Sequence, residues 1–127
     1  MRLAKWRCGQ GASHMVVDEE ALYEAMGQDE DTVRAVVATF LRALDAYQAE
    51  LEACLADGGS QAVREVAHKL KGALANLRAN EARAYAEALE MAAKESRNAD
   101  FASLAVALSK GMRDVRFFFQ AWSAAHH

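Results

Sequence analysis

Apolar residues along this chain recur at steps of three and four, the spacing that places side chains on one face of an α-helix. Four segments of helix length show this pattern, and a shorter one precedes them. They cover residues 18–26, 31–56, 60–79, 80–97 and 101–122. No segment shows the period of two that a half-buried strand requires, and no internal repeat is present. The pattern therefore predicts an all-α protein.

The connections between these segments are short. Gly27, Asp57-Gly58-Gly59 and Asn98-Ala99-Asp100 interrupt the pattern, and Ser60 and Asn80 are candidate caps for the helices that follow them. Short loops between long helices favour antiparallel neighbours. We therefore expect an antiparallel up-down four-helix bundle with a short additional N-terminal helix.

Composition supports one helical domain. The chain has 127 residues, 53% of them hydrophobic, and it has no proline. The ends follow no such pattern: Ser13-His14-Met15 resembles a cloning junction, and the last four residues resemble the start of a purification tag. We therefore expect a tag or linker over 1–14, the bundle over 15–123 and a tag remnant over 124–127, which leaves His68 as the only native histidine.

Charge and cysteine content exclude several classes of protein. Three of the 15 basic residues lie before Met15, so the rest of the chain carries 12 basic against 18 acidic residues. Such an acidic body is not expected to bind nucleic acid. No apolar run reaches the ~20 residues of a membrane span, and no secretory signal is evident. Cys8 and Cys54 do not form a disulfide framework, which suggests the reducing cytoplasm.

His68 lies on the polar face of the helix expected over 60–79. The apolar residues of that segment fall within about 100° of arc on a helical wheel. They are Val63, Val66, Ala67, Leu70, Leu74 and Leu77. His68 lies about 150° from the centre of this stripe, so its imidazole is expected to face solvent.

The neighbours of His68 on that face are basic or small. Arg64 and Lys71 add positive charge, and Ala75 continues a strip of low relief. Gly72 is unusual, because glycine inside a helix costs roughly 1 kcal/mol relative to alanine. It leaves the imidazole uncovered and lets another backbone approach. An exposed imidazole is largely neutral and nucleophilic at neutral pH, so this face suits a phosphoryl carrier, although a lone surface histidine is more often simply solvated.

Residues 67–77, Ala-His-Lys-Leu-Lys-Gly-Ala-Leu-Ala-Asn-Leu, resemble the A-H-x-L-K-G-x-x-x-x-L-G motif of histidine-containing phosphotransfer (HPt) domains. Similarity at motif level covers 63–90, including the pair Leu89-Glu90, and the helix order agrees over 16–122. The resemblance implies that His68 is the phosphoacceptor, that Lys71 steadies the phosphoryl group and that Gly72 gives a partner room. Arg78 departs from it, because the family commonly has a second glycine there, and this puts close helix packing at that point in doubt.

The resemblance also implies the partners. HPt domains exchange phosphoryl groups with receiver domains of response regulators and of hybrid sensor histidine kinases. They are carriers without an ATP site or cofactor, and Mg²⁺ belongs to the receiver. We expect a monomer whose docking surface surrounds His68. Its members would be Arg64, Glu65, Lys69, Ala75, Asn76 and Ala79.

Other functions fit the sequence less well. It has no glycine-rich phosphate loop for a kinase, too few ligands for zinc, and no inward-facing ligands for a cofactor in the bundle. Two alternatives remain open. One is a helical interaction module that docks a partner without phosphoryl transfer, and the other is a histidine domain phosphorylated by a chemotaxis-type kinase.

Overall fold

The computed structural model describes residues 15–126, so the expected tag over 1–14 lies outside the described residues. Five α-helices and one 3-10 turn follow one another. They are α1 (Glu19–Ala25), α2 (Glu30–Asp57), α3 (Ser60–Asn76), α4 (Asn80–Lys94), η2 (Asn98–Asp100) and α5 (Phe101–Ala125). The prediction of an all-α four-helix bundle with a short N-terminal helix is confirmed. No helix among the described residues is long and apolar enough to cross a membrane.

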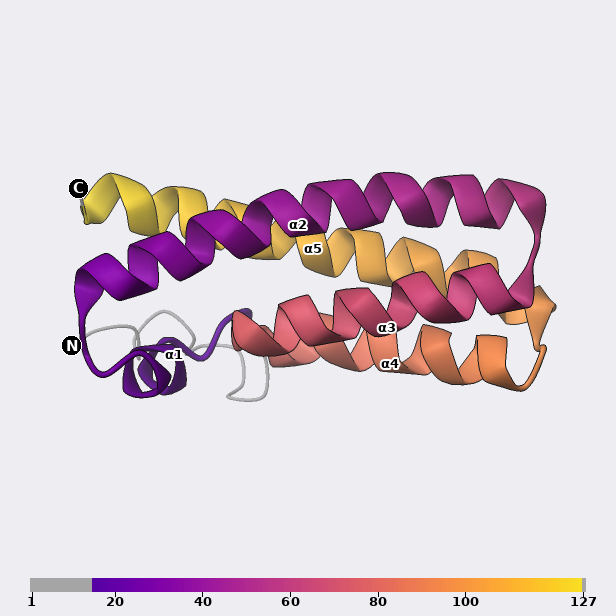
Figure 1. Ribbon diagram of the computed structural model, residues 1–127, viewed down its shortest axis with the longest axis horizontal. Helices are drawn as coiled ribbons and strands as arrows, with labels where there is room; N and C mark the ends of the chain where they lie inside the picture. Colours follow the sequence, from indigo (N-terminus) through magenta and orange to yellow (C-terminus); the bar gives the residue numbers. More distant parts are fainter. Residues whose placement is uncertain (1–14, 127) are drawn as a thin grey trace.

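Helices α2 to α5 run alternately up and down along the long axis of the molecule (Figure 1). Each contacts its sequence neighbour, and α5 returns to contact α2, which closes the bundle. The short α1 lies at one end, where the amide of Asp18 donates a 2.9 Å hydrogen bond to the carbonyl of Arg78, in the α3–α4 loop. The start of α2 and the end of α5 lie at this same end (Figure 1).

The buried face of each helix follows the apolar pattern of its sequence. Helices α2, α3 and α5 contribute mainly large side chains, whose burial stabilises the fold by about 1.5–3 kcal/mol each. Helix α4 differs, because four of its five buried residues are alanines. A β-carbon added at Gly111 of α5 would lie 3.1 Å from the β-carbon of Ala82. Small residues on both helices therefore let α4 lie close to its neighbours.

The α3–α4 connection explains why Arg78 departs from the family motif. It also shows that the expectation of Ala79 in the docking surface is wrong. Arg78 adopts a left-handed conformation, with φ 58°, just beyond the end of α3. The amide of Ala79 donates to the carbonyl of Leu74 at 3.0 Å, and that of Arg78 to the carbonyl of Ala75 at 3.1 Å, which is a Schellman motif. This fold-back buries Ala79 completely against the core. Ala79 therefore cannot belong to a docking surface, and position 78 forms the turn rather than a helix contact.

The expected caps at Ser60 and Asn80 are wrong. Both residues begin their helices instead of preceding them, and Gly59 and Ala79 occupy the cap positions without side-chain hydrogen bonds. The Ser60 hydroxyl instead donates to the side-chain carbonyl of Asn98 at 3.1 Å, and the Asn98 amide donates to the carbonyl of Gly58 at 3.2 Å. These bonds tie together the two loops at the far end of the bundle.

Helix α5 extends into the segment expected to be a tag remnant. The ring of His126 stacks on Trp122 with 4.7 Å between ring centroids, and its backbone carbonyl accepts a hydrogen bond from Arg34 of α2. These contacts place the end of the described chain against the start of α2. The origin of residues 124–127 stays a prediction.

We expect Ser96→Gly to raise the free energy of unfolding by about 0.5–1 kcal/mol, because Ser96 follows α4 with φ 55°. Left-handed geometry costs a non-glycine residue about 1–2 kcal/mol, which exceeds the entropy that glycine adds to the unfolded chain. Arg78→Gly should raise the free energy of unfolding by less, because it removes the 2.8 Å hydrogen bond that the Arg78 guanidinium donates to the Ala75 carbonyl. Urea denaturation measures both. Ser109→Gly, inside α5, is the control and should destabilise; a loss of stability in Ser96→Gly would contradict the prediction.

Candidate functional site

His68 lies midway along α3 on its solvent face, and its side chain is 67% exposed. Ala67, immediately before His68, and Leu70, two residues after it, are fully buried. The helical pattern of α3 therefore determines the orientation of the imidazole. The predicted exposure of His68 is confirmed.

Glu90 of α4 contacts the His68 ring. Its Oε2 lies 2.9 Å from Nδ1 of His68, and its side chain is only 19% exposed. An ionised carboxylate can only accept hydrogen bonds, so Nδ1 is the nitrogen that carries the proton. The lone pair of the neutral imidazole is then on Nε2. This pairing favours the tautomer that leaves the lone pair on Nε2.

Lys71 binds the other oxygen of the same carboxylate. Its Nζ lies 2.8 Å from Oε1 of Glu90, one turn along α3 from His68. Burial of the Glu90 carboxyl pushes its pKa upward, but hydrogen bonds from Lys71 and His68 outweigh burial and hold the pKa below its ordinary value. Glu90 is therefore ionised at neutral pH and joins the imidazole to the ammonium. We call these three side chains the Glu90 bridge.

Gly72 is exposed beside this bridge, and packing does not require it. A β-carbon added there would meet nothing within 4 Å, in contrast to Gly111. The carbonyl of Gly72 accepts a 2.9 Å hydrogen bond from the side-chain amide of Asn76. The fold would accept alanine at position 72, so the absence of a side chain affects only what approaches from solvent.

A hollow of about 520 Å³ adjoins the imidazole on the surface. Its walls come from α3 and α4 and carry both signs of charge. They are Gln61, Arg64, Glu65, His68, Lys69 and Glu90. The part of the chain that the structure describes contains no group of three or more histidine, cysteine or acidic residues that could hold a metal ion.

The remaining residues expected to dock a partner lie in different settings. Lys69 points toward α2, where its Nζ lies 3.1 Å from Oε2 of Glu50 and 5.6 Å from the ring centroid of Tyr47. Arg64, Glu65 and Asn76 are exposed, and Ala75 is half-buried. The exposed residues Arg64, Glu65 and Asn76 share the solvent side of α3 with His68, whereas Lys69 lies toward α2 and Ala79 is buried.

Sequence reasoning missed the role of Glu90, which lies 22 residues from His68 on another helix. In the sequence, the pair Leu89-Glu90 stands out only through its resemblance to the family. A further signal was present, because Glu90 falls between the buried residues Leu89 and Ala93 at the edge of the apolar stripe of α4. An acid at such an edge needs a cationic partner on the neighbouring helix.

The structure is therefore a four-helix bundle with an uncovered histidine whose ring is held by a carboxylate from the next helix. The sequence model of the Hpt domain matches residues 35–116. This is more than half of the chain, which therefore belongs to the Hpt domain family and functions in histidine phosphotransfer in phosphorelays.

A solved structure supports the fold. The crystal structure of histidine-containing phosphotransfer protein B from Pseudomonas aeruginosa PAO1 superimposes with a TM-score of 0.82 at 24% sequence identity. The match covers 88% of this chain and 97% of that one. No curated protein gives a significant match.

We expect Glu90→Gln to remove a contribution to stability that depends on pH. A carboxyl whose folded pKa is lowered stabilises the fold fully above its unfolded pKa, and this contribution is lost as pH falls through the folded value. The difference in free energy of unfolding between wild type and Glu90→Gln should therefore shrink as pH falls from about 5.5 to about 2.5. Denaturant titrations at each pH measure it. A difference that stays constant or grows toward acid would contradict the lowered pKa.

Proposed function

We propose that His68 accepts a phosphoryl group from the phosphorylated aspartate of a receiver domain and passes it to the aspartate of another receiver. The observation that carries this proposal is the contact of the exposed imidazole with Glu90 through Nδ1. Nε2 attacks the phosphorus of the aspartyl phosphate, the N–P bond forms, and the P–O bond to aspartate breaks with release of the carboxylate. The reverse step returns the phosphoryl group to an aspartate.

Glu90 suits this step because the ring becomes positively charged when Nε2 bonds to phosphorus while Nδ1 keeps its proton. A carboxylate 2.9 Å from Nδ1 stabilises that charge as it develops. No base needs to remove a proton, so the site requires a fixed negative charge rather than a proton acceptor. Glu90 acts here as a positioning residue that holds the imidazole and favours its charged form.

Lys71 supplies the positive charge that the phosphoryl group needs. A phosphoryl group carries about −1.5 to −2 charge near neutral pH, and a nearby ammonium offsets part of it. The Lys71 side chain is 28% exposed, so its Nζ is held by Glu90 yet remains within reach of solvent. The same carboxylate thus keeps an ammonium beside the imidazole before the phosphoryl group arrives.

The receiver would dock over the face of α3 around His68. Arg64, Glu65 and Lys69 provide charges on one side, and Gly72, Ala75 and Asn76 provide the low-relief side. This domain would carry no ATP site and no cofactor of its own, and Mg²⁺ would be held by the receiver. Its partners would be cytoplasmic response regulators or hybrid sensor histidine kinases.

We expect His68→Gln to abolish phosphoryl uptake from a radiolabelled receiver, because the substitution removes the nucleophilic nitrogen. Wild type should carry label that is lost in acid and retained in base, as phosphohistidine requires. Equal labelling of wild type and His68→Gln, or no labelling of either, would reject the proposal. Labelling by a chemotaxis-type kinase with ATP, but by no receiver, would favour the kinase-substrate alternative.

In the same assay Glu90→Gln should slow uptake roughly tenfold or more, because glutamine can still accept a hydrogen bond but carries no charge. Glu87→Gln is the matched control, since Glu87 lies on α4 and pairs with Arg83 at 3.5 Å. Equal rates for the two variants would remove Glu90 from the mechanism.

Two substitutions at Gly72 should distinguish its effect on stability from its effect on phosphoryl transfer. We expect Gly72→Ala to raise the free energy of unfolding by up to about 1 kcal/mol, because alanine favours the helix and its β-carbon meets nothing within 4 Å. Gly72→Gln should also fold but should transfer phosphoryl groups more slowly, because its longer side chain covers the approach to His68. Thermal unfolding and uptake rates measure the two effects. Unchanged transfer in Gly72→Gln would remove the argument from partner access.

A further inference from the structure

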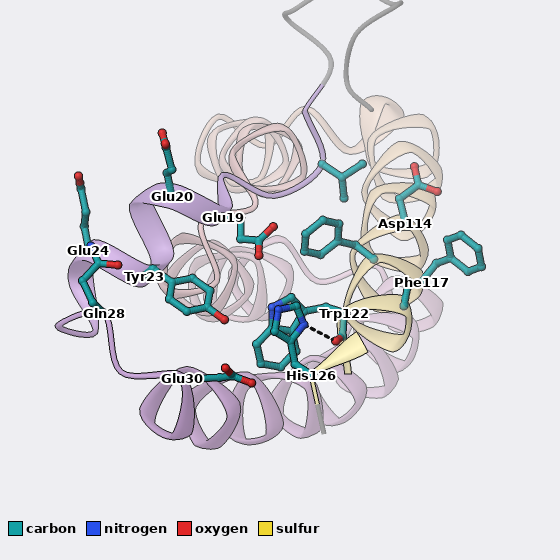
Figure 2. A pocket seen from close by; sticks show the side chains of 13 residues that line it. Glu19, Glu20, Tyr23, Glu24, Gln28, Glu30, Asp114, Phe117, Trp122 and His126 are labelled. Atoms are coloured by element: carbon teal, nitrogen blue, oxygen red, sulfur yellow. Dashed lines mark hydrogen bonds between the residues drawn. The ribbon is translucent and has the colours of Figure 1, made fainter. Parts of the chain in front are cut away.

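A second concavity lies at the end of the bundle where α1, the start of α2 and the last turns of α5 meet (Figure 2). Its volume is about 1090 Å³, and it shares no lining residue with the hollow beside His68. Aromatic rings form much of its surface, namely Tyr23, Phe117, Phe118, Trp122 and His126. The ring of His126 stacks on Trp122 and belongs to the segment expected to be a tag remnant. We call this concavity the aromatic cavity.

The aromatic cavity is strongly acidic. Its lining includes Glu19, Glu20, Glu24, Glu30 and Asp114, and neither a lysine nor an arginine. Arg34 pairs with Glu30 at 3.1 Å, and Lys110 pairs with Asp114 at 3.4 Å. Among residues 15–126, no ion pair engages Glu19, Glu20 or Glu24, all of which belong to α1. Within the described part of the chain, these three carboxylates are therefore open to a cation from outside.

Negative charge and aromatic surface meet at Tyr23. Its ring lies between Glu19 and Glu30, with the hydroxyl directed toward Trp122 (Figure 2). Burial raises the pKa of Tyr23, and the carboxylates of Glu30 and Glu19 raise it further, whereas a hydrogen bond from Trp122 and the charge of Arg34 lower it. A cation bound here would face both a ring and a carboxylate, an arrangement that favours guanidinium and ammonium groups.

The rim adds apolar surface. Phe117 is 72% exposed although its neighbour Phe118 packs edge-to-face on Phe119 of the core. An exposed phenylalanine beside an acidic cavity suits a ligand that has both apolar and cationic parts. Figure 2 also shows Glu20 and Glu24 pointing away from the rings, which spreads the negative charge beyond the reach of one small cation.

We propose that the aromatic cavity binds an arginine-containing basic segment of a partner protein. Arginine is favoured over lysine, because a planar guanidinium stacks on rings and pairs with carboxylates at the same time. The spread of the carboxylates favours several basic residues along a peptide over a single amine. A second copy of this chain would bring the same acidic surface against itself, and nucleic acid or an anionic membrane would be repelled.

This binding would be independent of phosphotransfer. The cavity and His68 have separate lining residues, so the domain could hold a basic segment while a receiver docks on α3. A loss of one function would leave the other intact.

The test is titration of the full chain into a fluorescein-labelled peptide of alternating glycine and arginine at low ionic strength, followed by anisotropy. We expect saturable binding that weakens as salt rises. Glu19→Gln and Glu24→Gln should each weaken it roughly twofold to fivefold, as expected for partly exposed charge pairs. Phe117→Ala should weaken it by a similar factor through loss of ring contact. Phosphoryl uptake at His68 should not change in any of these variants.

Matched controls distinguish binding in the aromatic cavity from a general electrostatic attraction between the basic peptide and the acidic protein. Glu52→Gln on α2 removes the same charge outside the cavity, and Val106→Ala removes an exposed apolar residue elsewhere on α5. Neither should alter binding. The proposal is overturned if the peptide does not bind, or if Glu52→Gln weakens binding as much as Glu19→Gln. It is also overturned if tetramethylammonium displaces the peptide at equal concentration, or if Phe117→Ala converts a dimer into a monomer, since the occupant would then be a small cation or a second copy.

Discussion

The close approach of α4 to its neighbours is the constraint on which the site depends. Large residues on α4 would push that helix outward, and the carboxylate of Glu90 would then lie too far from α3 to reach His68. The chain avoids this with four buried alanines on α4 and with Gly111 on α5, where a β-carbon would already crowd Ala82. Glu90 then lies within hydrogen-bond distance of His68 and Lys71, because the small buried side chains of α4 let this helix pack close to its neighbours. Packing and chemistry therefore depend on the same small residues.

Three positions in this chain show that glycine can be favoured for different physical reasons. Gly111 lies against a neighbouring helix, where a β-carbon would come within 3.1 Å of the β-carbon of Ala82, and the left-handed turn at Arg78 would favour glycine on conformational grounds. Gly72 satisfies neither condition, because it has ordinary helical geometry and open space around it. Its cost in helix stability is therefore unexplained by the fold, and the one feature beside it that could use the space is the approach to His68. A glycine without a structural reason is the clearest functional signal in α3.

Periodicity predicted the fold well, since each apolar stripe is a local property of one segment and the helices begin and end within a few residues of the expected bounds. It also predicted correctly that His68 faces solvent. It failed where the chain leaves the helix. A wheel extended to residue 79 placed Ala79 on the exposed strip, whereas the Schellman turn at Arg78 reverses the chain and buries it. Glu90 was missed for a related reason, because the register between two helices is set by packing and not by the sequence of either one.

The charge of the Glu90 bridge explains why one acid and one base both accompany the histidine. With a neutral imidazole, the charges of Glu90 and Lys71 cancel, so the resting bridge carries no net charge. After transfer, the ring gains a positive charge and the phosphoryl group brings about −1.5 to −2. Glu90 then balances the ring and Lys71 balances the phosphoryl group. Without Glu90 the charged ring would lose its counter-ion, and without Lys71 two anionic groups would face each other. Glu90 thus balances the ring while Lys71 balances the phosphoryl group, and a single half-buried carboxylate joins the two cations.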